Sequence, residues 1–400
     1  MKKVARPHVV LASRLFSPEV SAAAFRLRSL SLALSSTADV EVVTSIPPAH
    51  APQTPDPSAI SISRARVLRD PGGNVRGYIQ YMSFDVPLFF RLLRRRFDLA
   101  IAESPPTTGM VVAAVCALKR RPFVYYAADV WTDGVISMGA PKPVVAVMRW
   151  LERSVLRRAA RILSVSDEVT QRLELLDAAS DRISTIGNGI DTEVFRPDVD
   201  GASTEDYFVY TGTLSEWQRP ERFVEALALI ADDEPTVGIR FYGQGALLER
   251  TKQLAEELVP GRIVFGGVVS PAESARWIRG AVGALVSIVP GIGYDFARPT
   301  KTYAAAACGT PVLFAGASTG GALVRENRLG LGVDFTATAI ADAMRELLDQ
   351  RRSGLTEQLR MTRGRWAADN VSLVAAGERA ADATLNVLQE TMSAPSRLEK

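Results

Sequence analysis

Short, mainly apolar runs alternate with longer segments of helical periodicity along the first half of the chain. We expect strands at residues 8–12, 40–44, 60–67, 98–102, 122–126, 162–166 and 183–186. The intervening segments carry apolar residues at helical spacing, as at Phe25, Leu27, Leu30 and Leu34. Apolar strands that alternate with helices are typical of a parallel sheet covered on both faces. The pattern therefore predicts an α/β fold.

The same alternation restarts after Asp191. We expect strands at 207–210, 237–242, 263–265, 281–289 and 311–315, helices at 220–231, 246–258, 271–280 and 338–348, and a glycine-rich turn at 318–321. Four hundred residues exceed what one core usually holds, which favours two doubly wound halves that meet near residue 190. The predicted domains are 1–190 and 191–354, with helices at 355–392 packing across both and a flexible tail at 393–400.

Composition narrows the class of protein. The apolar fraction of 47% and the charged fraction of 23% are those of an ordinary globular protein. A net charge of +3 argues against a nucleic-acid binder, although basic residues cluster at 91–96, 119–121 and 149–158. Such clusters are either solvated faces or sites for anionic lipid heads, which allows peripheral contact with the inner face of a membrane.

The cysteine and histidine content predicts neither a disulfide framework nor a metal site. Cys116 and Cys308 lie far apart in the sequence, and His8 and His50 are the two histidines. The N-terminal apolar run, Val9–Ala12, is too short for a signal peptide or a membrane span. We therefore expect a cytoplasmic protein without metal or cofactor.

The stretch 289–312 has the pattern of an anion site. An apolar strand leads into a segment with Gly291 and Gly293, and then Pro299, Thr300 and Lys301 open an alanine-rich helix. Backbone N–H groups and the positive end of the helix dipole meet at such a point, and Lys301 adds a full charge. The alternative is an ordinary loop with a lysine on the surface.

Polar residues also follow three predicted strands of the first half, at Arg14–Glu19, Glu103–Pro106 and Asp129–Trp131. Ligands of parallel sheets bind beyond the carboxyl ends of the strands, which makes these residues candidates for a second site. Asp129 is alternatively a helix cap or a turn residue.

Several stretches, in this order, resemble the GT-B glycosyltransferases, and more narrowly retaining family 4 in the branch that builds cell-surface polysaccharides and O-antigen. The resemblance is carried by FSPEVSAAAFRLR at 16–28, SPP at 104–106, IGNGIDTEVFRP at 186–197, PTK at 299–301 and GTP at 309–311. It implies two Rossmann-like domains that face each other across a cleft. The N-terminal domain would bind a glycan, lipid-linked or small-metabolite acceptor, and the C-terminal domain a nucleotide-diphosphate sugar.

The resemblance also implies roles for single residues. Lys301 would neutralise the departing diphosphate without a metal, and Asp129 would act with it as the second catalytic residue. The substrate-binding positions would be Arg14, Glu19, Glu103, Ser104, Asn188, Gly212, Thr213, Gln218, Arg219, Gly243, Gly245, Val268, Asp295 and Thr300. Thr213 and Gln218 stand where relatives have Arg and Lys, and Arg219 beside them is alternatively a solvent-facing arginine.

The chain departs from the family at two further positions. Phe296 and Ala304 occupy the places of two glutamates, of which the second normally binds the donor ribose, and Asp295 is a partial substitute for the first. These departures leave the donor open and favour an alternative, a catalytically silent relative that binds a glycan or a partner enzyme. A GT-B epimerase would need histidines near the sugar, which the sequence does not supply.

Overall fold

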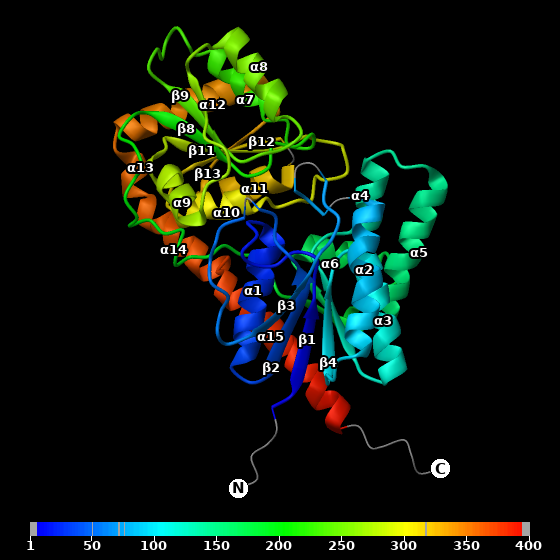
Figure 1. Cartoon of the computed structure of the whole chain (residues 1–400). Helices are drawn as coiled ribbons and strands as arrows, with labels where there is room; N and C mark the ends of the chain where they lie inside the picture. Colours follow the sequence, from blue (N-terminus) through cyan, green and yellow to red (C-terminus); the bar gives the residue numbers. More distant parts are fainter. Residues whose placement is uncertain (1–5, 50, 71–72, 76, 317, 394–400) are drawn as a thin grey trace, which may run out of the picture. The chain divides into compact units, whose positions relative to one another are not determined.

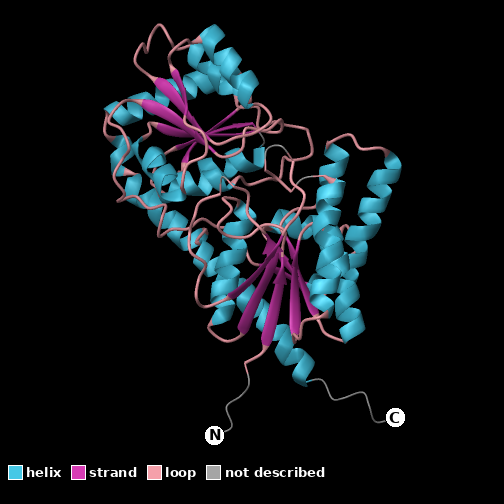
Figure 2. Cartoon of the chain, in the orientation of Figure 1, coloured by secondary structure: helices cyan, strands magenta, loops and turns pink. Residues whose placement is uncertain are grey.

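The computed structural model describes residues 6–49, 51–70, 73–75, 77–316 and 318–393. The chain divides into two compact units, Met1–Asn188 together with Leu373–Lys400, and Gly189–Ser372 (Figure 1). Each unit has a parallel sheet between helices (Figure 2). The tail predicted at 393–400 lies outside the described residues, apart from Ser393 at the end of the last helix.

The first unit is built on a seven-stranded sheet of order β3-β2-β1-β4-β5-β6-β7. Its strands are β1 (His8–Ala12), β2 (Asp39–Ser45), β3 (Ser61–Ala65), β4 (Leu99–Glu103), β5 (Phe123–Ala127), β6 (Arg161–Ser164) and β7 (Ile183–Thr185). All neighbouring strands are parallel, and Leu11 lies in register with Val42 on one side and Ile101 on the other. The central strands are fully buried, which accounts for their continuous apolar sequence.

Helices cover both faces of this sheet. They are α1 (Ala22–Ser35), α2 (Tyr78–Leu93), α3 (Pro106–Lys119), α4 (Trp131–Ser137), α5 (Lys142–Arg158), α6 (Asp167–Glu174) and α15 (Leu373–Ser393), with a 3₁₀ turn at Ser180–Arg182. Helix α1 packs against α15 on one face, while α3 packs between α2 and α5 on the other (Figure 1).

The second unit repeats the arrangement with six strands in the order β10-β9-β8-β11-β12-β13. These are β8 (Tyr207–Thr211), β9 (Gly238–Tyr242), β10 (Ile263–Phe265), β11 (Gly283–Ile288), β12 (Val312–Gly316) and β13 (Gly330–Val333). The helices are α7 (Glu221–Ala228), α8 (Leu248–Leu258), α9 (Pro271–Gly280), α10 (Thr300–Ala307), α11 (Ser318–Glu326), α12 (Ala337–Arg352), α13 (Leu355–Gln358) and α14 (Arg360–Asn370). One apolar cluster holds α9, α10 and α14 against the sheet, and another holds α7 and α12.

Serine caps fix the start of several helices. Ser166 accepts a hydrogen bond from the Val169 N–H at the start of α6, and Ser270 accepts one from the Glu273 N–H at the start of α9. These caps satisfy N–H groups that have no partner within the helix. Each is a serine directly before the first helical residue, the position at which a side-chain oxygen can accept such a bond.

The glycine-rich turn predicted at 318–321 is wrong, because these residues begin helix α11. A Cβ atom on Gly320 would lie 2.1 Å from the Phe314 ring, so glycine lets the helix lie directly on β12. Helix α4 and strand β13 were also not predicted. The segment predicted to cross both halves divides between the units, since α13 and α14 belong to the second and α15 to the first.

None of the described helices combines the length and the apolarity needed to cross a bilayer.

Candidate functional site

In each sheet the strand order reverses at a central pair, β1 and β4 in the first unit and β8 and β11 in the second. Loops that leave such a pair in opposite directions open a crevice at the carboxyl ends of the strands. Most of the predicted site residues come from these loops.

Lys301 is the second residue of α10, directly after the loop that leaves β11. Its Nζ atom lies 3.0 Å from Gln218 Oε1 and 3.6 Å from the centre of the Tyr210 ring. Gln218 comes from the loop after β8, and Tyr210 from β8 itself. The structure therefore brings Lys301 and Gln218 together at the reversal point of the second sheet.

Tyr210 is a site residue that the sequence analysis missed. Its hydroxyl lies 2.8 Å from the Thr213 carbonyl and also contacts Gln218 Oε1, so the ring is fixed beneath the lysine. Burial raises the pKa of Tyr210 far above its ordinary value, which keeps the phenol protonated. In the sequence it is one apolar residue of a buried strand, and that pattern carries no signal for a site.

The Lys301 ammonium has no carboxylate partner. Among the described residues, no carboxylate oxygen lies within 4.0 Å of Nζ. The side chain is half-buried, and loss of water around the ammonium lowers the pKa of Lys301 well below its ordinary value. A desolvated cation without a counter-ion is suited to bind an anionic ligand.

Glycines allow Lys301 and the neighbouring loops to pack closely. Gly212 has a φ of +112°, and a Cβ there would lie 3.5 Å from Lys301 Cε. Gly243 has a φ of +143°, and its Cβ would lie 1.9 Å from the Gly212 carbonyl oxygen. Gly245 is equally constrained, at 2.2 Å from the Leu214 carbonyl oxygen. The β9 loop therefore needs these glycines to pack on the β8 loop, independently of any ligand.

The other predicted residues of the second unit lie around this centre. Asp295 accepts a hydrogen bond of 2.9 Å from the Gly291 N–H, so one of its oxygens closes the β11–α10 loop. Thr300 is the first residue of α10 and is half-buried. The side chains of Thr213, Arg219 and Val268 are exposed. Arg219 has a left-handed backbone with φ of 43°.

Three aromatic side chains line the same two loops, and the sequence analysis did not select them for the site. Trp217 stacks on Tyr294 with ring centres 5.8 Å apart, and Tyr294 stacks on Phe296 at 6.5 Å. All three are half-buried. Phe296, at the position where the resemblance places a glutamate, is thus part of an aromatic stack.

In the first unit, Arg14, Glu103 and Ser104 lie at the β1–β4 reversal. Glu103 is buried and accepts hydrogen bonds from the hydroxyls of Ser13, at 3.1 Å, and Ser104, at 3.3 Å. Burial raises the pKa of Glu103, against the opposing charges of Arg14 and Arg26. The three predicted residues therefore share one electrostatic environment.

Arg14 already has protein partners. Its guanidinium lies 4.1 Å from the centre of the Tyr81 ring and 6.0 Å from that of Trp131, and it donates a hydrogen bond to the Val75 carbonyl. Glu19 forms an ion pair of 2.9 Å with Arg69. The structure thus pairs Glu19 with Arg69.

Asp129 follows β5, and its side chain reaches the solvent. Desolvation by the surrounding protein raises the pKa of Asp129, and nearby Arg26 acts in the opposite direction. The helix that follows is capped by a different carboxylate, since Glu152 accepts hydrogen bonds of 2.8 Å from the N–H groups of Trp131 and Thr132. Asp129 is therefore not the cap of α4. Asn188 is the last residue of the first unit.

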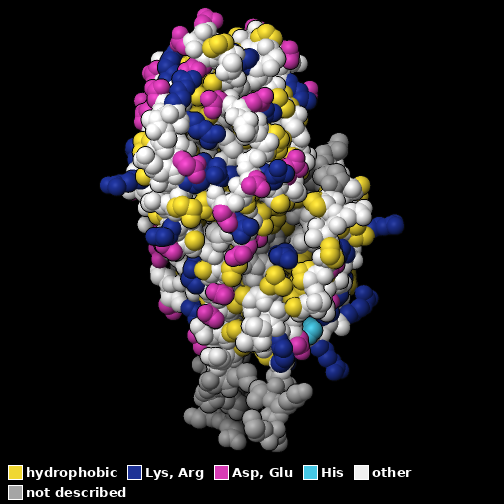
Figure 3. Space-filling view, turned by 90° about the vertical axis from the view of Figure 1, so that its left-hand side faces the viewer, with side chains coloured by type: hydrophobic (Ala, Val, Ile, Leu, Met, Phe, Trp, Pro, Cys, Tyr) yellow, Lys and Arg dark blue, Asp and Glu magenta, His cyan; other side chains and the backbone are white. Residues whose placement is uncertain are grey.

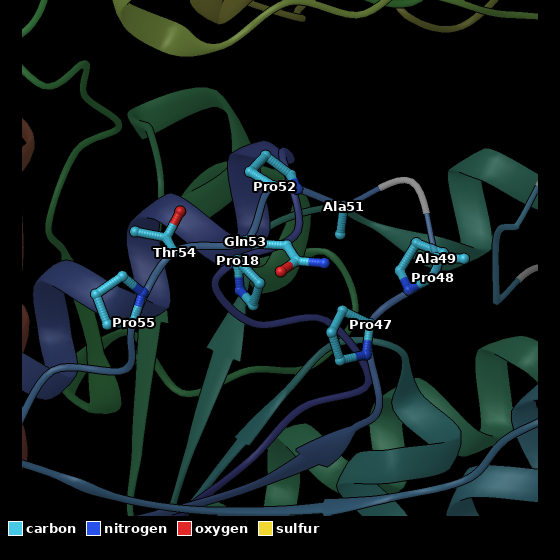
Figure 4. A pocket seen from close by; sticks show the side chains of 9 residues that line it. All are labelled: Pro18, Pro47, Pro48, Ala49, Ala51, Pro52, Gln53, Thr54 and Pro55. Atoms are coloured by element: carbon cyan, nitrogen blue, oxygen red, sulfur yellow. The ribbon is translucent and has the colours of Figure 1, made fainter.

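Two further features bear on a ligand. The described part of the chain contains no group of three or more His, Cys, Asp or Glu side chains that could hold a metal ion. A pocket of 480 Å³ opens in the first unit, where Pro18 faces residues 47–49 and 51–55 (Figure 4). Its described lining is proline, alanine, Gln53 and Thr54, so it offers no charge to an anionic ligand.

Comparison with known families assigns both halves of the chain. Residues 23–194 match the model of Glycosyltransferase Family 4, and residues 205–350 match that of Glycosyl transferases group 1. The D-inositol 3-phosphate glycosyltransferase of Frankia alni is 27% identical over 234 residues, which cover 52% of this chain and 55% of that protein. The enzyme of that name from Corynebacterium glutamicum is 29% identical over 211 residues, which cover 48% of this chain and 49% of that protein. The chain thus spans about half the length of these curated relatives.

Solved structures are similar over almost the whole chain. HepE of Anabaena, in complex with UDP-glucose, gives a TM-score of 0.69 at 15% identity and covers 95% of this chain and 99% of its own. Sucrose-phosphate synthase of Thermosynechococcus elongatus gives a TM-score of 0.70 at 16% identity and covers 98% of this chain and 100% of its own. At such identities the likeness shows the fold, which confirms the predicted pair of Rossmann-like domains of GT-B type. The chain is therefore similar to Glycosyltransferase Family 4 over residues 23–194 and to glycosyl transferases group 1 over residues 205–350.

Proposed function

We propose that this protein transfers a sugar from a nucleotide-diphosphate sugar to an acceptor hydroxyl, with retention of the anomeric configuration. The two family matches and the likeness to HepE, which was solved with UDP-glucose, support a donor of this class. No metal or cofactor takes part in the proposed reaction.

The observation that carries the proposal is the Lys301 ammonium, which lies over Tyr210 at the reversal point of the second sheet without a carboxylate partner. A donor diphosphate would supply the missing negative charge. Because the leaving group gains charge as the C1–O bond breaks, this interaction strengthens in the transition state, as catalysis requires.

The proposed step balances without a protein nucleophile. The bond between the sugar C1 and the β-phosphate oxygen breaks, and its electron pair remains on the phosphate beside Lys301. The acceptor oxygen attacks C1 from the same face as the leaving group, and its proton passes to the departing phosphate. Retention follows because the new bond replaces the old one on the same side of the ring.

For the acceptor we propose a phosphorylated or glycan-type polyol bound by the first unit. The curated relatives are named D-inositol 3-phosphate glycosyltransferases, which is consistent with an anionic polyol. Arg26 supports the anionic class, because it lies near Asp129 and Glu103 and its Nε has no hydrogen-bond partner among the described residues. Lipid-linked and uncharged glycan acceptors are the alternatives to test beside it.

A second candidate function is a silent relative that binds a glycan or a partner enzyme. It is favoured by Phe296 and Ala304, which replace two family carboxylates with apolar side chains. Thermal unfolding with a panel of nucleoside diphosphates and their sugars separates the two functions, because a ligand that binds only the folded state raises the melting temperature. We expect at least one nucleotide sugar to do so and to be consumed with release of its nucleoside diphosphate when an acceptor is present. No shift with any nucleotide would favour the silent relative.

A further inference from the structure

The buried face of α13 and α14 in the second unit carries hydrogen-bond donors in place of apolar side chains. Thr356, Arg360 and Arg363 follow one another at helical spacing, and Leu359 between the two helices also has a helical backbone. The three side chains therefore share one face. They are 1%, 2% and 3% exposed, although arginine is rarely buried so completely unless it is paired. We call these three residues the donor face.

The donor face closes the C-terminal ends of two neighbouring helices. Arg360 Nη1 donates hydrogen bonds to the carbonyls of Cys308, at 3.1 Å, and Arg279, at 3.4 Å. Arg363 Nη1 donates one of 3.4 Å to the Gly309 carbonyl. A Cβ atom on Gly309 would lie 2.5 Å from the Arg360 carbonyl oxygen, so α14 packs directly on the end of α10. The opposite end of α10 carries the proposed diphosphate site.

Three donor groups of this face have no acceptor among the described residues. They are Arg360 Nη2, Arg363 Nε and the Thr356 hydroxyl, and all three are buried. Arg363 Nη1 lies 3.3 Å from the Thr356 carbonyl oxygen, and burial together with the charge of Arg360 lowers the pKa of Arg363 to about 10, so the three side chains are neighbours. Buried donors are normally bonded to protein, to ordered water or to an ion.

The charges around the donor face favour an ion over water. Arg279, Arg360 and Arg363 bring three positive charges, and Glu357 balances one of them, at 3.5 Å from Arg279 and 2.8 Å from Arg360. A fourth arginine, Arg351, has a carboxylate of its own at 3.9 Å. The ends of α9 and α10 supply about half a negative charge each, which leaves about one positive charge uncompensated.

The imbalance belongs to the buried side of these helices. The donor face has no carboxylate of its own, and Glu357 beside it is 64% exposed, so solvent screens its charge. By contrast, the exposed face shown in Figure 3 intersperses Asp and Glu with Lys and Arg. Water at the donor face would satisfy the donors but would leave two buried guanidinium groups without a counter-charge.

We propose that the donor face binds a small monovalent inorganic anion, with chloride as the ion to test. One negative charge matches the charge that remains, and a small ion is required because all three donor groups are buried. The bound anion would hold α14 against the end of α10 and so fix the helix that carries Lys301. This site is separate from the proposed diphosphate site and independent of the proposed sugar transfer.

The first test is thermal unfolding of the full chain at constant ionic strength, with sodium chloride in place of sodium gluconate, whose anion is too large to be buried there. A ligand that binds only the folded state raises the melting temperature. We expect a rise of about 3–6 °C for each tenfold increase in chloride above its dissociation constant. Bromide should act like chloride.

Two substitutions assign this effect to the donor face. Thr356→Val removes one donor and should lower chloride affinity about threefold to tenfold, while Arg363→Met removes a charge and should lower it about tenfold or more. In gluconate, Thr356→Val should keep or raise the melting temperature, because the lost hydroxyl has no partner among the described residues. If Arg363→Met does not fold, the Thr356→Val comparison decides alone.

Thr251→Val is the matched control, since Thr251 is equally buried but donates a hydrogen bond of 2.6 Å to the Leu247 carbonyl. It should lower the melting temperature by the same amount in both salts. Crystals soaked in sodium bromide then locate the ion, which should give an anomalous peak beside Arg360 Nη2, Arg363 Nε and the Thr356 hydroxyl. Three outcomes would overturn the proposal: no chloride-dependent rise, a rise that both variants retain in full, or water in place of bromide at these donors.

Discussion

Replacing Lys301 by methionine is the sharpest test of the proposed diphosphate site. Methionine keeps an unbranched apolar chain over the Tyr210 ring but removes the ammonium, which lies 3.0 Å from Gln218 Oε1. A hydrogen bond to a charged group contributes about 1.5–3 kcal/mol. If the ammonium binds the diphosphate, affinity for a nucleoside diphosphate should fall roughly tenfold to 150-fold.

The same change should leave the fold intact. In the free protein the half-buried Lys301 ammonium has lost water without gaining a carboxylate among the described residues. Its compensation is the bond to Gln218 and the cation–π contact with Tyr210, and the latter contributes about 0.5–1 kcal/mol. Removing a poorly compensated charge at a binding site is often neutral or stabilising. We expect the free energy of unfolding to change by less than about 1 kcal/mol or to rise.

The pH dependence of nucleotide affinity distinguishes loss of the Lys301 charge from simple loss of a contact. The pKa of Lys301 is lowered in the folded protein, so its charge costs stability below that pKa, and the cost disappears as pH rises past the unfolded value near 10.5. Diphosphate binding needs the charged form. Affinity should therefore fall with rising pH in the unchanged protein, starting below pH 10.5, and should stay flat over that range in Lys301→Met.

The assay is titration calorimetry with UDP and GDP, together with thermal unfolding. Lys252→Met serves as the matched control, since Lys252 lies on α8 and pairs with Glu249 at 2.8 Å. Unchanged nucleotide affinity in Lys301→Met, combined with a clear loss of unfolding free energy, would refute the reasoning. Lys301 would then be a structural cation packed on Tyr210.

Three further substitutions test the surrounding structure, each by urea unfolding. Gly243→Ala should lower the free energy of unfolding by more than about 2 kcal/mol, because the new Cβ would lie 1.9 Å from a carbonyl oxygen. Gly261→Ala is the control: nothing lies within 4 Å of its Cβ, so it should lose only the energy of its strained positive φ. Equal losses in the two variants would contradict the packing argument. Burial raises the pKa of Asp85, which means that its charged form costs stability at neutral pH. Asp85→Asn should therefore stabilise the protein at neutral pH, and this gain should shrink as pH falls toward 3.8. A gain in stability that does not depend on pH would exclude this cause. Glu152→Gln should cost about 1–3 kcal/mol, because both carboxylate oxygens accept N–H groups and an amide offers one acceptor; a neutral result would mean that α4 does not need this cap.

Much of the fold could be predicted because the sequence of each strand reflects how deeply that strand is buried. Continuous apolar runs such as residues 99–102 belong to strands buried on both faces, and Ser166 and Ser270 mark helix starts because their hydroxyls accept N–H groups of the first turn. The error at 318–321 arose because glycine normally breaks helices. Only the packing of Gly320 on Phe314, a tertiary contact, explains why glycine serves a helix there.

The candidate site was predictable only where residues lie on loops at strand ends. Lys301 and Gln218 are distant in sequence, and the meeting of their loops follows from the strand order of the sheet. Tyr210 could not be found, because a platform beneath an ammonium and an ordinary core tyrosine have the same strand pattern. The pairing of Glu19 with Arg69 was equally hidden, since ion pairs between loops leave no periodic signal.

The departures at Phe296 and Ala304 acquire a common explanation in the structure. Ala304 belongs to the apolar cluster around α10 and is 4% exposed, while Phe296 stacks on Tyr294. A carboxylate at position 304 would be buried in that apolar cluster, so the local packing disfavours the glutamate that the resemblance places there. Donor affinity would then depend on the diphosphate rather than on the ribose hydroxyls. We accordingly expect UDP and 2′-deoxy-UDP to bind within about threefold of each other, since a charge-assisted bond to the 2′-hydroxyl would separate them by at least about tenfold. Competition calorimetry measures this ratio, and a preference of tenfold or more for UDP would show that another group of the chain holds the ribose.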